Sequence, residues 1–234
     1  MGQDICQNIE DVSTRIRKAC TRADRDPEEV QLIAISKMKP LEDIKTAFGC
    51  GQLHFGENRA KELQDKMEAY EEDQIQWHMV GNLQTNKIKY MVNRVNWIDS
   101  VPKSKTLREI EKRASRIDRV INTLIQINIS GEDQKSGCEP ENLADILEYA
   151  QGLEYVRVRG LMGMATFVDK DKVEKVRPEF QLLREVRDEH RSYECKNIQL
   201  DELSMGMTND MEIAIEEGST MVRVGRAIFG ERNY

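Results

Sequence analysis

Apolar residues recur along this chain in two alternating patterns. Residues 4 to 24 carry apolar side chains at helical spacing, at Ile5, Ile9, Val12, Ile16 and Ala19. This spacing predicts an amphipathic helix that buries one face. Residues 30 to 36 read VQLIAIS, an almost unbroken apolar run. Such a run is typical of a parallel strand that is covered on both faces, so the chain opens with a predicted helix followed by a predicted buried strand.

The same alternation continues to the end of the chain. Seven further short apolar runs are predicted strands: Leu53–Gly56, Ile75–Val80, Val95–Ile98, Thr123–Ile129, Val156–Met162, Gln199–Leu203 and Met221–Val224. The segments between them, such as LEDIKTAFGCG and VEKVRPEFQLLREVRDEHR, have amphipathic helical character. Parallel neighbours need crossovers of about this size. Eight such units predict an α/β fold, a (β/α)8 TIM barrel, with an open doubly wound sheet as the alternative.

Composition supports one barrel domain over residues 1–234. The length of 234 residues falls in the range of roughly 200–250 residues that is common for single α/β barrels. The 35 basic and 42 acidic side chains give a formal net charge of −7, which argues against general attraction to nucleic acid or to an anionic membrane. No apolar run approaches the ~18 residues of a membrane span, and the first residues lack the apolar core of a secretory signal.

Cysteine and histidine usage narrows the chemistry further. The five cysteines, at positions 6, 20, 50, 138 and 195, are odd in number and form no CxxC pair. This predicts reduced thiols and a cytoplasmic protein. The three histidines, His54, His78 and His190, show no clustered ligand spacing, so no metal site is expected.

Lys37 follows the first predicted strand directly, in the stretch AISKMKP. In a barrel of this kind the functional groups gather at the carboxyl ends of the strands. A lysine amine in a partly dry site loses its proton more readily, and a neutral amine attacks an aldehyde to form a Schiff base. The alternative is a solvated surface lysine, which is the ordinary environment for this residue type.

Two small-residue loops near the end of the chain are candidate phosphate sites. Residues 204 to 207 read SMGM and precede Thr208, Asn209 and Asp210, which resemble helix-capping residues; Asn209 and Glu212 have capping-box spacing. A second loop begins at Gly225 after the last strand. Barrels frequently bind phosphate between the loops after strands seven and eight. Opposite a strand-end lysine, these loops favour a ligand with both a phosphate and an aldehyde.

Arg223 lies between two valines on the last predicted strand. An arginine in this position points into the barrel or toward the outer helices, and either environment demands a partner. If it points inward, it is placed to donate to a ring nitrogen and keep that nitrogen unprotonated. The spacing alone leaves an equally good alternative, an arginine paired with a structural carboxylate.

Seven ordered motifs along the chain resemble those of the pyridoxal phosphate homeostasis proteins. These are AISKMKP, HFGEN, WHMVGNLQTNK, IQINISGEDQKSG, GLMGMA, LSMGMTNDMEIAIEEGST and MVRVGRAIFG. The resemblance implies the barrel of the alanine racemase N-terminal domain (fold type III) and binding of pyridoxal 5′-phosphate (PLP). It also implies that the β-rich second domain of alanine racemase is missing, since the chain ends at Tyr234 soon after the last motif.

The resemblance also implies roles for particular residues. Lys37 matches the lysine that forms the internal aldimine with PLP, and Arg223 matches the arginine that faces the pyridine nitrogen. The other implied cofactor-binding positions are Asn58 and His78 in the pocket and Ser204, Gly206, Gly225 and Arg226 at the phosphate. The chain departs from the family pattern at Arg226, where Thr is usual, at Asn82, where Pro is usual, and at Arg59, where Tyr is usual. The first departure leaves only the backbone NH as a secure phosphate donor at position 226.

The function implied is intracellular PLP (vitamin B6) homeostasis, in which the chain stores or delivers the cofactor without turnover. The alternative is a PLP-dependent amino-acid racemase, which needs a second acid or base on the opposite face of the substrate. None of the six tyrosines lies in a recognised motif. A Schiff-base lyase acting on a sugar phosphate is a weaker alternative. The expected partners are PLP and, transiently, PLP enzymes that lack their cofactor, and a monomer without nucleic acid or membrane contact is expected.

Overall fold

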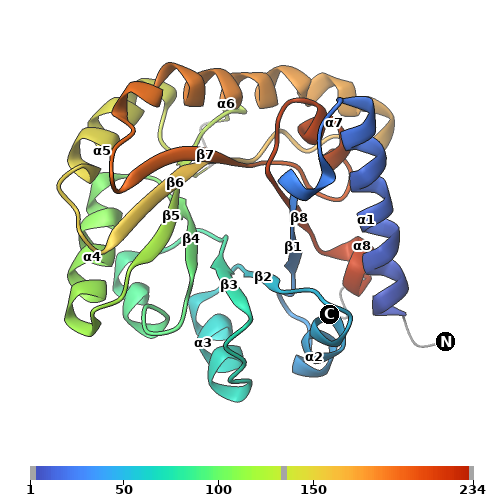
Figure 1. The fold of residues 1–234 in the computed structure, drawn as a ribbon, viewed down its shortest axis with the longest axis horizontal. Helices are drawn as coiled ribbons and strands as arrows, with labels where there is room; N and C mark the ends of the chain where they lie inside the picture. The colour runs from blue at the N-terminus through green and yellow to red at the C-terminus, as the bar shows by residue number, and fades with distance from the viewer. Residues whose placement is uncertain (1–3, 133–135, 232–234) are drawn as a thin grey trace.

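Eight parallel strands close into a barrel in this protein (Figure 1). The structure is a computed structural model and describes residues 4–132 and 136–231. The strands are β1 (Gln31–Ile35), β2 (His54–Glu57), β3 (Gln76–Met79), β4 (Trp97–Val101), β5 (Ile121–Ile127), β6 (Val156–Gly163), β7 (Ile198–Ser204) and β8 (Met221–Val224). They pair in sequence order, and β8 pairs with β1 to complete the ring. The predicted (β/α)8 barrel is confirmed, and the open sheet is excluded.

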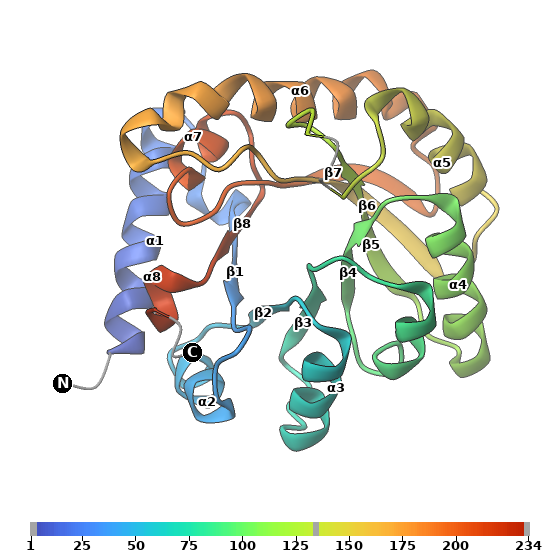
Figure 2. The ribbon, with the colours of Figure 1, turned by 180° about the vertical axis from the view of Figure 1, so that it is seen from behind.

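Helices surround the barrel on its outer face (Figures 1 and 2). They are α1 (Ile5–Arg22), α2 (Leu41–Gly49), α3 (Ala60–Ala69), α4 (Ser104–Ala114), α5 (Leu143–Ala150), α6 (Arg177–Glu189), α7 (Met211–Glu216) and α8 (Arg226–Phe229). The crossover between β3 and β4 contains a 3-10 helix, η2 (Thr85–Tyr90), in the place of an α-helix. The first helix, α1, lies alongside α7 and α8, so the two ends of the described chain pack together.

Two apolar cores hold the fold together. The larger core lies between the strands and the surrounding helices, and α1 contributes to it the face that its spacing predicts. The smaller core fills the barrel interior with Ile33, Trp97, Leu124, Met162 and Met221. Inward-pointing side chains of this kind make the centre of such a barrel a packed layer. The open space is therefore confined to the mouth of the barrel.

The polar side chains of His54, His78 and Asp99 contact one another in a row within the barrel. His54 Nδ1 lies 3.0 Å from His78 Nε2, and His78 Nδ1 lies 3.0 Å from Asp99 Oδ2. The His78 ring stacks on Trp97 with 5.3 Å between the ring centroids. Burial lowers the pKa of His54 to about 4, and repulsion from His78 acts in the same direction. His54 is therefore neutral at physiological pH.

The predicted strands are found, with shifts at their ends. The last strand begins and ends at the predicted residues, Met221 and Val224. The predicted strand Val95–Ile98 is instead β4, which begins at Trp97 and continues to Val101. Its added residues include the buried polar side chains Asp99 and Ser100. An apolar run cannot reveal a strand end that is polar, because those side chains are held by hydrogen bonds inside the protein.

The cysteines differ from the sequence-based expectation. Cys6 on α1 and Cys50 at the end of α2 form a disulfide, with 5.6 Å between their Cα atoms. Cys20 and Cys138 are buried free thiols, and Cys195 is an exposed free thiol. The prediction of five reduced thiols is wrong for the first pair, because α1 and α2 pack together although the two cysteines are far apart in sequence.

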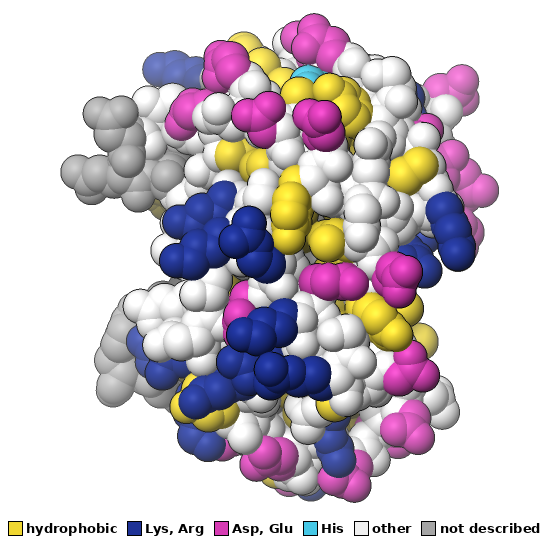
Figure 3. Space-filling model, turned by 90° about the vertical axis from the view of Figure 1, so that its left-hand side faces the viewer, with side chains coloured by type: hydrophobic (Ala, Val, Ile, Leu, Met, Phe, Trp, Pro, Cys, Tyr) yellow, Lys and Arg dark blue, Asp and Glu magenta, His cyan; other side chains and the backbone are white. Residues whose placement is uncertain are grey.

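Charged side chains of both signs cover the surface. Lys and Arg gather near the middle of the face on the α4 and α5 side, with Asp and Glu around them (Figure 3). On α4 the basic residues alternate with acids, and Arg113 pairs with Glu109 at 2.6 Å. This mixture is typical of a solvated helix face. Within the residues described, no helix has the length and apolar character needed to cross a membrane.

Gly160 marks the irregular part of β6 and offers a test of the barrel packing. The pairing registers of β6 with β5 and with β7 both shift between Val158 and Gly160. A Cβ atom placed here would lie 1.9 Å from the carbonyl oxygen of Glu202 on β7. We expect Gly160→Ala to lower the free energy of unfolding by about 2 kcal/mol or more, because a strand must move to relieve the overlap. Urea-induced unfolding followed by circular dichroism measures the change.

Gly152→Ala is the matched control for this substitution. A Cβ at Gly152 would have the carbonyl oxygen of Tyr149, 3.9 Å away, as its nearest neighbour. This variant is expected to unfold within about 0.5 kcal/mol of the parent protein. Equal stability of the two variants would contradict the close approach of β6 and β7.

Candidate functional site

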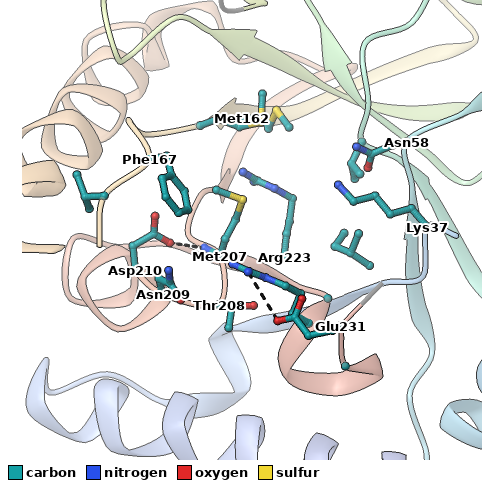
Figure 4. Close-up of a pocket in the computed structure, with 17 residues that line it drawn as sticks. Lys37, Asn58, Met162, Phe167, Met207, Thr208, Asn209, Asp210, Arg223 and Glu231 are labelled. Carbon is teal, nitrogen blue, oxygen red and sulfur yellow. Dashed lines mark hydrogen bonds and ion pairs between the residues drawn. The ribbon is translucent and has the colours of Figure 1, made fainter. Parts of the chain in front are cut away.

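A cavity of about 370 Å³ opens at the carboxyl ends of the barrel strands. Its wall comes from the ends of β1, β6 and β8 and from the segments that follow β1, β2, β3, β6, β7 and β8. The size falls within the range of roughly 300–1,000 Å³ that is usual for small-molecule sites. Most of the wall is apolar, with a few polar groups that converge on the open space (Figure 4). The cavity therefore has the form expected of a site that binds a small molecule in one defined orientation.

Lys37 reaches this cavity from the segment after β1. Figure 4 shows its side chain extending into the open space from one side, while Arg223 enters from β8. The neighbouring residue Met38 adopts a positive φ of 60°. Asn58, the first residue after β2, lies beside Lys37 in the wall. A primary amine, a guanidinium and an amide therefore share one enclosed space.

Arg223 is the most buried cation of the site, with 4% of its surface exposed. Its guanidinium donates to the Ser204 hydroxyl at 2.7 Å and to the Gly163 carbonyl at 2.9 Å. Burial lowers the pKa of Arg223, while the charges of Asp99 and Asp210 act in the opposite direction. An arginine remains cationic under such conditions. The side chain points inward, and its hydrogen bonds go to neutral oxygens, which decides between the two orientations that the sequence left open.

The loop after β7 is shaped by Gly206 and Asp210. Gly206 adopts a φ of +91°, and a Cβ there would lie 2.6 Å from the Cβ of Ala214. Only glycine fits this turn without displacing α7. The carboxylate of Asp210 accepts the NH of Met207 at 2.5 Å, and burial raises the pKa of Asp210. The loop thereby presents Met207, Thr208 and Asn209 to the cavity.

The predicted capping box at this loop is wrong. The helix α7 begins at Met211 with Asp210 as its N-cap, and no side chain caps it. Glu212 instead pairs with Arg15 on α1 at 2.7 Å. The Glu212 carboxylate forms a stronger, bidentate ion pair with an arginine on another helix. The spacing of neighbouring residues in the sequence cannot reveal such a pair.

The loop after β8 forms the remaining wall. Gly225 and Arg226 both line the cavity, and Arg226 opens the short helix α8. The Arg226 side chain is half exposed and lies 3.9 Å from a carboxylate oxygen of Glu231. A guanidinium therefore sits at the rim of the cavity at position 226.

Five of the eight residues implied by the resemblance line the cavity: Lys37, Asn58, Arg223, Gly225 and Arg226. Ser204 is fully buried and holds Arg223 through its hydroxyl, and Gly206 packs against α7. His78 is placed behind the cavity rather than in its wall, because its two ring nitrogens face His54 and Asp99. None of these three residues lines the cavity, and of the three Ser204 bonds directly to a residue of the wall, Arg223.

Sequence reasoning missed the apolar part of the wall. Met162, Met164 and Met207 line the cavity, and Met162 also belongs to the core of the barrel interior. Phe167 lies at the rim with 72% of its surface exposed. It occurs in an irregular segment after β6 without periodicity, so no pattern could have singled it out. The strand-end position of the methionines was the only available signal.

The chain matches a protein family over almost its full length. The family described as "Alanine racemase, N-terminal domain" matches residues 8–233. The chain is 44% identical over 230 residues to the pyridoxal phosphate homeostasis protein of Aquifex aeolicus (strain VF5), with 98% of this chain and 99% of that protein aligned. It is 36% identical over 234 residues to the protein of the same description from Escherichia coli (strain K12), covering 99% and 98% of the two chains.

Solved structures agree with these relatives. The structure of PipY from Synechococcus elongatus PCC7942 with PLP bound superposes with a TM-score of 0.79 at 32% identity, covering 94% of this chain and all of that one (100%). Alanine racemase from Clostridium difficile 630 shares the fold, with a TM-score of 0.72 at 14% identity, and is covered over 57% of its length. Because the family match and the curated relatives span nearly the whole chain, this protein belongs to the alanine racemase N-terminal domain family and, within it, to the pyridoxal phosphate homeostasis proteins.

Proposed function

We propose that this chain binds PLP in the barrel-mouth cavity and takes part in PLP homeostasis by holding the cofactor reversibly on Lys37. The neutral Lys37 amine adds to the aldehyde carbon, water leaves, and a Schiff base remains. Addition of water reverses the step and releases the cofactor. The observation that carries the proposal is the meeting of Lys37 and Arg223 in one cavity of suitable size. The PLP-bound relative PipY supports it.

The buried Arg223 suits a pyridine ring whose nitrogen stays unprotonated. Its guanidinium is fixed by Ser204 and Gly163 and has donors but no acceptor. A protonated ring nitrogen makes PLP a strong electron sink, and an arginine beside that nitrogen withholds this activation. Arg223 therefore supports a role in holding the cofactor, with little activation of an attached amino acid.

The two glycine-containing loops suit the phosphate. The NH groups of Arg226 and Ala227 open α8 and have no acceptor within the helix. Thr208 and Asn209 face the same cavity from the loop after β7. The Arg226 guanidinium adds a positive charge at the rim, which attracts a phosphate dianion. We propose that Arg226 replaces the lost threonine hydroxyl through this charge.

The cavity offers little for racemisation. A racemase needs a second acid or base across the substrate from the lysine. Among the residues that the structure describes, no tyrosine lines the cavity, and Tyr234 lies outside them. The carboxylates of Asp210 and Glu231 do line it, and they are engaged with the Met207 NH and with Arg226. We therefore propose that the chain holds the cofactor without turnover. We further propose that it is a monomer of the cytoplasm and binds neither nucleic acid nor membrane. Its protein partners would be PLP enzymes that transiently lack their cofactor.

Reduction with borohydride tests the role of Lys37. Purified protein with PLP is expected to show an absorption band of the Schiff base that Lys37→Ala abolishes. Borohydride should fix the cofactor on Lys37, and peptide mass spectrometry identifies the modified lysine. Lys45→Ala removes an exposed lysine on α2 and should leave the band unchanged. A label on another lysine, or a band that survives Lys37→Ala, would rule out this assignment.

Replacing Arg226 by the residue usual in the family tests the phosphate assignment. We expect Arg226→Thr to weaken PLP binding by about threefold to tenfold, since a hydroxyl supplies a neutral hydrogen bond in place of a charged one. Pyridoxal, which lacks the phosphate, is the matched control ligand and should bind both proteins equally. Isothermal titration with the two ligands measures the difference. An equal loss for pyridoxal would place Arg226 elsewhere than at the phosphate.

A PLP-transfer assay distinguishes a protein that holds the cofactor from an enzyme that uses it. The PLP-loaded protein is expected to activate a PLP enzyme supplied without cofactor, while releasing D-amino acid from an L-amino acid no faster than free PLP does. The Lys37→Ala variant, incubated with the same PLP, serves as control for transfer of loosely bound cofactor. Turnover well above that of free PLP, lost in Lys37→Ala, would favour the racemase-like alternative over a holding function.

A further inference from the structure

A buried ionic cluster lies behind the Lys37 segment, outside the cavity. Its centre is Lys66 on α3, which is 8% exposed. The Lys66 amine donates to the Ser36 carbonyl at 2.8 Å, to Glu57 Oε1 at 2.6 Å and to Glu62 Oε1 at 2.8 Å. Glu57 is completely buried at the end of β2. One ammonium group thus uses its three donors on two carboxylates and one main-chain carbonyl.

The two carboxylates hold the residues on either side of Lys37. The Ser36 hydroxyl donates to Glu57 Oε1 at 2.6 Å. The Met38 NH donates to Glu62 Oε1 at 2.6 Å. Lys66 holds both carboxylates in place, so residues 36 and 38 are tied to a single group on a neighbouring helix. This fixes the direction in which the Lys37 side chain leaves the main chain.

The backbone at Met38 needs such support. Its φ of 60° lies in the left-handed region, which side-chain-bearing residues enter at an energetic cost. Residues persist in such conformations where the surrounding structure determines them. The bond from the Met38 NH to Glu62 supplies that constraint at the residue directly after Lys37.

The composition of the cluster indicates more than general stabilisation. Burying a lysine and a glutamate carries a desolvation penalty, and an apolar pair often stabilises a fold equally well. Burial raises the pKa of Glu57 although Lys66 opposes it, and Glu57 Oε2 has no hydrogen-bond partner among the described residues. A simple bridge between β2 and α3 would not need bonds to residues 36 and 38.

We propose that Lys66, acting through Glu57 and Glu62, is a positioning residue that aims the Lys37 amine into the cavity. Lys66 does not line that cavity and faces a separate groove with Lys39 and Glu62, so its effect on a ligand is indirect. The consequence for Schiff-base formation rests on the proposed function. The effect on the main chain at residues 36 to 38 does not.

Two measurements on matched variants test the positioning role. Lys66→Met removes the ammonium and keeps most of the side-chain length. Lys61→Met is the control, because Lys61 lies on the exposed side of α3 and pairs with Asp65 of the same helix. In the protein without ligand, amide hydrogen exchange at Lys37 and Met38 is expected to rise about tenfold in Lys66→Met and to stay unchanged in Lys61→Met, as for the loss of one charge-assisted bond. Lys66→Arg, which keeps several donors, should restore part of the protection.

A double-mutant cycle with PLP shows whether Lys66 acts through Lys37. Lys66→Met is expected to lower the equilibrium constant for PLP binding about tenfold in the parent protein and to have no effect in the Lys37→Ala background. An equal loss in both backgrounds, or unchanged exchange at Lys37 and Met38, would overturn the proposal. If Lys66→Met does not fold, Glu62→Gln takes its place, since it keeps the buried Lys66–Glu57 pair and weakens the bonds of residue 62 to the Met38 NH and to Lys66.

The outcomes also separate this inference from the proposed function. A parent protein that forms no Schiff base, with faster exchange at Lys37 and Met38 in Lys66→Met, would overturn PLP holding and support the positioning of Lys37. Normal Schiff-base formation in both Lys66→Met and Glu62→Gln would overturn the positioning role and leave PLP holding intact.

Discussion

The site depends on one pairing, that of β8 with β1. Ile33 lies opposite Arg223, and Ala34 lies opposite Val224, in the parallel ladder that closes the barrel. This register places Lys37, just after β1, beside Gly225 and Arg226, just after β8. A shift of one residue would turn Arg223 from the barrel interior to the outer helices, because side chains alternate along a strand. The positions of the Lys37 amine, the Arg223 guanidinium and the cavity rim therefore all depend on this one strand pairing.

Much of the barrel was predictable from apolar runs, and the reasons for the failures are physical. Met221–Val224 was predicted to the residue because its residues other than Arg223 are apolar and a turn bounds it. The end of β4 was missed because Asp99 and Ser100 are polar residues buried with partners on β3 and in the segment after it. The Cys6–Cys50 disulfide was missed because helix packing brings together residues that the sequence separates. The periodicity of apolar residues indicates which side chains are buried. It does not indicate which residues far apart in the sequence form hydrogen bonds or a disulfide with each other.

The same distinction applies to the site. Lys37 and Arg223 were found because strand ends are informative in a barrel, and the resemblance resolved the orientation that spacing left open. Lys66 reads in the sequence as one more charged residue of an amphipathic helix, although it is buried and bonded to the Lys37 segment. His78 was expected in the wall and lies behind it, stacked on Trp97. A motif does not distinguish a residue that lines the cavity from one that lies behind it.

The closure of the barrel also bears on how the protein reaches its native state. Lys37 and Gly225 lie at opposite ends of the sequence, so the cavity cannot form on the ribosome until β8 has been synthesised and has docked on β1. Contacts of such long range form late in folding. A ligand that binds only the closed barrel stabilises it by mass action and cannot stabilise partly synthesised chains. Cofactor supply would thereby influence the fraction of newly made chains that stay folded and escape proteolysis.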